Sequence, residues 1–177
     1  MKKLRLLVTT KCHNTCKGCC NNDWDLEKLP ICNDFSVWNM IMITGGEPML
    51  CMPWLEHLLK RIRLENRECK IILYTAIPKG IIHSPYGFTR LIDLCLIDGI
   101  TATIHVEKDV AGFEMLERSF FSVDPFRLSE MSLRLNIFKG ISEIKPIFNW
   151  TIKKDIEWIE NCPLPEDETF MRLERMF

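Results

Sequence analysis

The stretch Met40-Ile41-Met42-Ile43-Thr44-Gly45-Gly46-Glu47-Pro48 is typical of an apolar strand that ends in a turn, and a helical pattern follows it at Trp54 to Glu65. Paired glycines commonly end strands, and two residues without a Cβ let backbone groups approach a ligand closely. In a parallel α/β protein the ends of the strands form the substrate-facing edge. This segment therefore predicts an α/β fold with a site at its strand ends.

Alternating strand and helix patterns continue along the chain, with no long linker or repeat. Such alternation predicts parallel strands joined by right-handed crossovers. No helix is expected with confidence between Asn21 and Val37. The expected strands are Leu4 to Thr9, Trp38 to Thr44, Lys70 to Thr75, Ile100 to Val106, Ser132 to Phe138 and, weakly, Pro146 to Thr151. Beyond the helix already named, helical patterns cover Thr89 to Ile97, Val110 to Phe120 and Ile152 to Glu160.

Three closely spaced cysteines stand in the run Cys12-His13-Asn14-Thr15-Cys16-Lys17-Gly18-Cys19, directly after the first expected strand. Three thiolates can ligate three irons of a [4Fe-4S] cluster and leave the fourth iron open. A structural zinc site is the alternative, but closed zinc sites usually present two separated pairs of ligands, and no second pair exists here. Cys20 adjoins the last ligand and would replace it after a one-residue slip, although the spacing favours Cys19. The remaining cysteines are expected to be core or incidental residues: Cys32, Cys51, Cys69, Cys95 and Cys162.

Together, the CxxxCxxC run and Gly45-Gly46-Glu47-Pro48 resemble the signature of the radical S-adenosylmethionine (radical SAM) superfamily. The resemblance implies a partial (βα)6 TIM-like barrel over residues 1–162, with Cys12, Cys16 and Cys19 as ligands of a [4Fe-4S] cluster. It also implies that Gly45, Gly46, Glu47 and Pro48 contact the amino group of SAM, with the Glu47 carboxylate placed to contribute. Residues 163–177 are then a C-terminal tail that folds over the barrel mouth as a lid or hangs free.

Polar residues alternate with apolar ones along the fourth and fifth expected strands. Since side chains alternate between the faces of a strand, the apolar set should face outer helices and the polar set the barrel lumen. An ordinary small barrel fills its lumen with branched apolar residues, so a polar lumen indicates a bound polar ligand. By family precedent these strands contact the SAM carboxylate and ribose, which makes Thr103, His105, Arg134 and Asn136 the candidates. The alternative is that one strand is an edge with its polar face in water.

The activity implied by the resemblance is reductive cleavage of SAM to methionine and a 5'-deoxyadenosyl radical, which abstracts hydrogen from a small molecule, nucleotide or peptide. The electron comes from a flavodoxin- or ferredoxin-like donor. Cys16-Lys17-Gly18-Cys19-Cys20-Asn21-Asn22-Asp23-Trp24 also resembles the activase branch, which installs a glycyl radical in a partner enzyme. Lys17 departs from the proline usual there. A non-catalytic iron-sulfur or zinc module is the third hypothesis, and it predicts metal without SAM cleavage.

Composition limits the remaining classes. With 177 residues, 47 % of them hydrophobic and 27 % charged, the chain is expected to form one globular domain. No apolar run approaches the length of a bilayer span, and the start Met1 to Val8 is better explained as a strand than as a signal peptide. Cysteines spaced for a metal site favour a reducing cytoplasm. A net charge of -1 indicates no general nucleic-acid binding and no attraction to anionic membranes.

Overall fold

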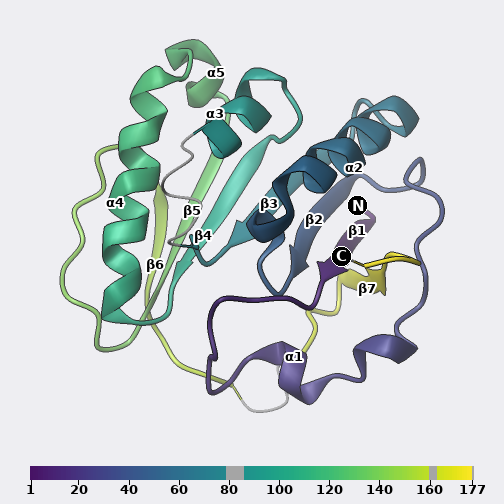
Figure 1. The fold of residues 1–177 in the computed structure, drawn as a ribbon, viewed down its shortest axis with the longest axis horizontal. Coiled ribbons are helices and arrows are strands. Elements are labelled where there is room, and N and C mark those ends of the chain that lie inside the picture. Colours follow the sequence, from purple (N-terminus) through teal and green to yellow (C-terminus); the bar gives the residue numbers. More distant parts are fainter. Residues whose placement is uncertain (79–85, 160–162, 177) are drawn as a thin grey trace.

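In the computed structural model, which describes residues 1–78, 86–159 and 163–176, one parallel sheet holds seven strands. Their order is β6-β5-β4-β3-β2-β1-β7, so the sheet is open, and β6 and β7 are its two end strands. The chain therefore has an α/β fold, and six strands follow one another in sequence order across the sheet (Figure 1). The strands are β1 (Lys3–Thr9), β2 (Met40–Gly45), β3 (Lys70–Thr75), β4 (Gly99–Ile104), β5 (Ser132–Phe138), β6 (Thr151–Ile156) and β7 (Glu168–Arg172).

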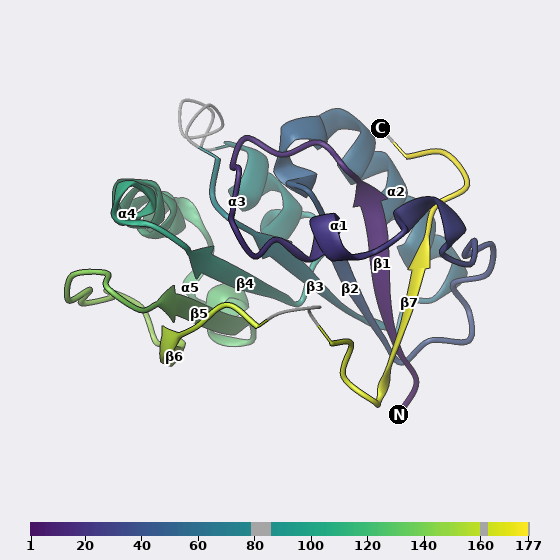
Figure 2. The same cartoon turned by 90° about the horizontal axis from the view of Figure 1, so that it is seen from below.

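Three helices lie together on one face of this sheet, as Figures 1 and 2 show from two directions. They are α2 (Met52–Glu65), α3 (Tyr86–Asp93) and α4 (Val110–Ser119). The short α5 (Pro125–Ser129) precedes β5, and α1 (Cys20–Asp23) follows the cysteine loop. Short 3-10 turns occupy Leu26–Lys28, Pro48–Cys51, Glu107–Asp109 and Phe120–Ser122. The face that carries these helices is called the helix face below, and the opposite face the open face.

Alternation along the strands assigns their side chains to these two faces. In β5, for example, Leu133, Leu135 and Ile137 are buried, whereas Ser132 and Arg134 are exposed. Burial of apolar side chains between sheet and helices is the main stabilising contribution to such a layer. The polar set, as expected from the sequence, lies on the other face. The apolar strand residues of the core include Leu4, Leu6, Ile41, Ile43, Ile71, Leu73, Ile100, Ala102 and Ile104.

The largest difference from the sequence predictions is a strand in place of an expected helix. Residues Thr151–Ile156 form β6 beside β5, where a helix from Ile152 was expected, and the weak strand expected from Pro146 begins only at Thr151. Every β6 residue before Ile156 is exposed. The segment therefore lacks the row of buried apolar residues by which a strand is recognised from sequence. Pairing with β5 through backbone hydrogen bonds decides its structure instead.

The C-terminal segment contributes a strand, which corrects the expectation of a tail that lies over the mouth or hangs free. β7 pairs with β1 in parallel over five residue pairs, from Lys3↔Glu168 to Leu7↔Arg172. Arg5 also forms an ion pair with Glu168 at 2.6 Å, and Leu173 is buried in the core. Residues 168–172 therefore belong to the sheet, which holds one strand more than the six expected over residues 1–162.

None of the helices in the described residues is both long enough and apolar enough to cross a bilayer.

Candidate functional site

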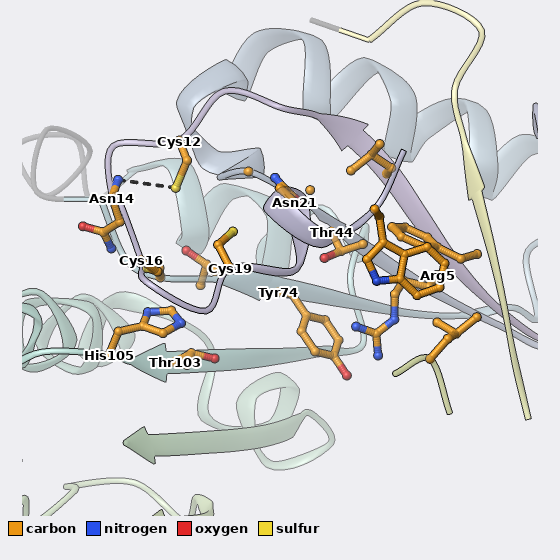
Figure 3. Close-up of a pocket in the computed structure, with 18 of the residues that line it drawn as sticks. Arg5, Cys12, Asn14, Cys16, Cys19, Asn21, Thr44, Tyr74, Thr103 and His105 are labelled. Atoms are coloured by element: carbon orange, nitrogen blue, oxygen red, sulfur yellow. Dashed lines mark hydrogen bonds between the residues drawn. The ribbon is translucent and has the colours of Figure 1, made fainter. Parts of the chain in front are cut away.

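A cavity of about 180 Å³ lies at the carboxyl ends of the strands, between the cysteine loop and the sheet (Figure 3). Its walls come from β1 and the loop after it, from the carboxyl ends of β2, β3 and β4, and from β7 with the connection that precedes it. Parallel strands bring such distant segments together because all their carboxyl ends meet at one edge. Of the residues predicted from the sequence, this cavity is lined by Cys12, Cys16, Cys19, Gly45, Gly46, Thr103 and His105.

The three predicted metal ligands are free thiols that share this cavity. Burial, together with the neighbouring Cys19 and Cys12, raises the pKa of Cys16 to about 11. The pKa of Cys12 is raised as well, mainly by burial, against hydrogen bonds such as that from the Asn14 backbone N–H to Sγ at 3.4 Å. A bound metal cation would reverse this rise in pKa, because thiols that coordinate a metal lose their protons.

The cysteine loop is docked onto the glycine pair through backbone contacts. The Gly46 N–H donates to the Thr9 carbonyl at 2.7 Å, and the Glu47 N–H donates to the Lys11 carbonyl at 2.7 Å. A Cβ on Gly46 would lie 2.0 Å from the Lys11 carbonyl oxygen, and one on Gly45 2.2 Å from that of Thr9. Gly45 also has a φ of +143°, which residues with a side chain rarely adopt. Because Gly45 and Gly46 have no side chains, the backbone of the cysteine loop can pack directly against them. Their own backbone is also exposed in the cavity.

Glu47 and Pro48 are placed differently from the prediction. The Glu47 carboxylate is fully buried and accepts hydrogen bonds from the Met49 N–H (3.0 Å), the Thr75 hydroxyl (2.9 Å) and the Ala76 N–H (2.7 Å). Burial raises its pKa to about 7 against these three donors. Pro48 is buried at the start of a 3-10 turn. Neither residue lines the cavity, and the Glu47 carboxylate connects the end of β2 to that of β3.

The four strand candidates separate into two groups. Thr103 and His105 line the cavity, and Asn136 is linked to it through a 3.5 Å hydrogen bond from its amide to the Thr103 hydroxyl. Arg134 lies apart from this cavity: it is on the predicted face but pairs with Thr101, one alternation earlier along the strands. Two residues move a side chain about 6.6 Å along a strand, and Arg134 consequently lines a second cavity.

Unpartnered polar atoms mark the cysteine cavity as a ligand site. Asn14 Nδ2 and His105 Nδ1 are buried without a hydrogen-bond partner in the described part of the chain, and both residues line the cavity. Buried polar atoms are nearly always hydrogen-bonded, so two such atoms in one cavity call for a partner that the chain itself does not supply. His105 is held by its ring, which stacks on Trp158 at 5.3 Å and contacts Phe138 at 5.0 Å. Burial lowers the pKa of His105.

Several lining residues were not predicted from the sequence. Asn14 lies within the cysteine run itself, and Arg5 and Tyr74 occupy open-face positions of β1 and β3, where alternation with buried neighbours was a usable signal. Trp24 and Trp158, which are far apart in the sequence, also both line the cavity. The contact of Trp158 with the loop is close: a Cβ on Gly18 would lie 2.7 Å from its ring.

Comparison of the sequence with models of protein families and with curated proteins gave no match.

The donor set of the cavity is suited to iron or zinc by its chemistry, since three thiols face one space. In the described residues, however, no three His, Cys, Asp or Glu side chains are gathered closely enough to form a metal site. A cluster would therefore require the loop side chains to converge on it. The alternative ligand Cys20 has a side chain that lies outside the described residues.

Proposed function

We propose that this protein is a radical SAM enzyme whose [4Fe-4S] cluster is held by Cys12, Cys16 and Cys19. One observation carries the proposal: the three thiols of the CxxxCxxC run line a single cavity together with the Gly45-Gly46 pair at the carboxyl ends of parallel strands. The open sheet is then the partial barrel of this superfamily, extended by β7. When bound, cluster and SAM supply a 5'-deoxyadenosyl radical after one-electron reduction by a flavodoxin- or ferredoxin-like donor.

The residues of the chain bind and orient these groups. The three cysteines would hold the cluster, and the backbone of Gly45 and Gly46 lines the same cavity. Asn14 Nδ2 and His105 Nδ1 offer hydrogen bonds to polar groups of a ligand, since no described residue uses them. The aromatic and apolar side chains of Trp158, Pro163 and Leu164 lie on the remaining side and exclude water.

The substrate class stays broad: a small molecule, a nucleotide or a peptide. Activation of a glycyl-radical partner is kept as a second candidate because of one observation. Asn21 and Trp24, the residues that carry the activase resemblance after the cysteines, both line the cavity.

Anaerobic reconstitution with iron and sulfide tests the proposal. The protein should bind about four irons and four sulfides, and with dithionite and SAM it should release 5'-deoxyadenosine without any substrate. Single replacements Cys12→Ala, Cys16→Ala and Cys19→Ala should abolish both the cluster and the product. Cys95→Ala, which removes an exposed thiol elsewhere, and Cys20→Ala should leave both unchanged. Stoichiometric zinc in place of iron, or a cluster that cleaves no SAM, would contradict the proposal.

A further inference from the structure

A second cavity, of about 530 Å³, lies on the open face at the amino ends of the strands. Lys3, Met40, Lys70 and Ser132, the first residues of β1, β2, β3 and β5, stand at its rim. Tyr74 lines both this cavity and the one that holds the cysteines, so the two share a wall in the middle of the sheet. Nothing in the radical SAM proposal uses this space.

The second cavity carries an excess of positive charge. Its lining includes six cationic and four anionic side chains, which leaves an excess of two positive charges. Two neighbours outside the lining do not change this balance, because Asp167 pairs with Lys3 while Arg5 pairs with Glu168. The cations are Lys3, Arg63, Arg67, Lys70, Arg127 and Arg134, and the anions are Glu68, Asp98, Glu130 and Glu168.

Apart from the exposed Arg67, whose side chain has no hydrogen-bond partner among the described residues, two guanidinium groups in this lining have unused donors. Arg63 is fully engaged, with bonds to Asp98 (2.5 Å) and the Cys69 carbonyl (2.6 Å). Arg134, in contrast, forms no hydrogen bond or ion pair with any described residue. Its positive charge repels that of nearby Lys3. Arg127 donates to the Ile97 carbonyl at 3.0 Å and pairs with Glu130 at 3.4 Å and Asp98 at 3.9 Å, but its Nε is buried and lacks a partner among the described residues. Unpaired guanidinium donors in a cavity favour an oxyanion, which they can bind bidentately.

We propose that this cavity binds the phosphate group of a small organic phosphate monoester. A phosphate monoester carries about -1.5 to -2 charges at pH 7, which matches the excess of two positive charges, whereas a single carboxylate supplies half of it. Met40, Met42, Ile72 and the Tyr74 ring form an apolar floor for the organic part. The site stands on its own geometry and does not depend on the radical SAM proposal.

Calorimetric titration with phenyl phosphate tests this site. The wild-type protein should bind it, and Arg134→Gln should weaken binding about tenfold or more, the usual cost of losing a charged hydrogen-bond donor. Arg118→Gln, on the exposed surface of α4, is the matched control and should bind as the wild type does. Phenylacetate, with one negative charge, should bind at least about tenfold more weakly than phenyl phosphate. Loading the iron-sulfur cluster should leave the affinity for phenyl phosphate unchanged.

Three results would overturn the proposal: no binding of phenyl phosphate at millimolar concentration, equal binding by Arg134→Gln and wild type, or equal affinity for phenylacetate. Circular dichroism of Arg134→Gln confirms that the variant is folded, and Lys70→Gln provides a second lining variant that should also weaken binding. Because these titrations read phosphate binding alone, they succeed or fail separately from SAM cleavage.

Discussion

At the scale of single residues, the sequence predicted that Glu47 contacts a ligand. In the structure its side chain instead forms hydrogen bonds within the fold. Its buried carboxylate joins the end of β2 to Thr75 and Ala76 at the end of β3. Burial raises its pKa from 4.5 to about 7. Between pH 4.5 and about pH 7 the folded protein binds more protons at Glu47 than the unfolded chain does. The contribution of Glu47 to the free energy of unfolding therefore falls as pH rises. The full loss is about 3 kcal/mol above neutral pH.

We therefore expect the free energy of unfolding of the metal-free wild type, relative to Glu47→Gln, to decrease between about pH 5 and pH 8. Urea unfolding at a series of pH values, with a chelator present, measures this difference. Buried histidines such as His105 contribute equally to both proteins and cancel in the difference. Glu114→Gln, on the exposed face of α4, should keep the wild-type pH dependence. A difference between wild type and Glu47→Gln that does not vary with pH would show that the carboxylate stays ionised in the fold.

Sequence reasoning at this scale identified which face a residue occupies better than where along the strand it lies. The spacing of Cys12, Cys16 and Cys19 brought all three to one cavity, because a short loop keeps its residues together. The alternation in β4 and β5 assigned Thr103 and Arg134 to the same face correctly. Alternation repeats every two residues and carries no information on the position along the strand. It therefore could not show that Thr103 faces one cavity and Arg134 the other.

At the scale of elements, the bounds of β3 and β5 follow directly from their apolar periodicity, whereas β6 and β7 do not. Both are end strands, and end strands bury less of their surface, which weakens the pattern on which prediction depends. The acidic run before β7 and the single aromatic Phe170 gave little reason to expect a strand there. Its existence depends on pairing with β1, more than 160 positions away, which no local pattern records.

This pairing predicts the effect of truncation. Removing residues 168–177 strips β1 of its five paired neighbours, of the Arg5–Glu168 ion pair and of buried Leu173. The loss should reach several kcal/mol, a large share of the roughly 5–15 kcal/mol that stabilises an ordinary domain. Removing only residues 174–177 keeps every one of those contacts and serves as the control. Urea unfolding of the two truncated proteins should show a large drop in midpoint for the first alone; equal midpoints would mean that β7 is dispensable.

At the scale of the whole molecule, the two faces of the sheet have separate tasks. The helix face holds α2, α3 and α4 (Figure 2) and nearly all of the apolar core. The open face carries one cavity at each end. The connection from β6 to β7 links the two end strands and brings Trp158 to the cysteine loop. The cysteine cavity is therefore lined by residues from the first, middle and last parts of the chain, which the parallel sheet brings together.

This assembly places an optical reporter beside the proposed cluster. Trp158 lies against Gly18 in the loop and against His105, whereas Trp54 is on α2, on the helix face. Iron-sulfur clusters absorb in the range of tryptophan emission and quench nearby indoles by energy transfer, with an efficiency that falls steeply with distance. Reconstitution should therefore quench the tryptophan emission of the wild type. The decrease in emission should be smaller in Trp158→Phe than in Trp54→Phe. Trp24 also lines the cavity, so some quenching should remain in Trp158→Phe. Equal changes in the two variants would place the cluster away from this cavity, whatever its iron content.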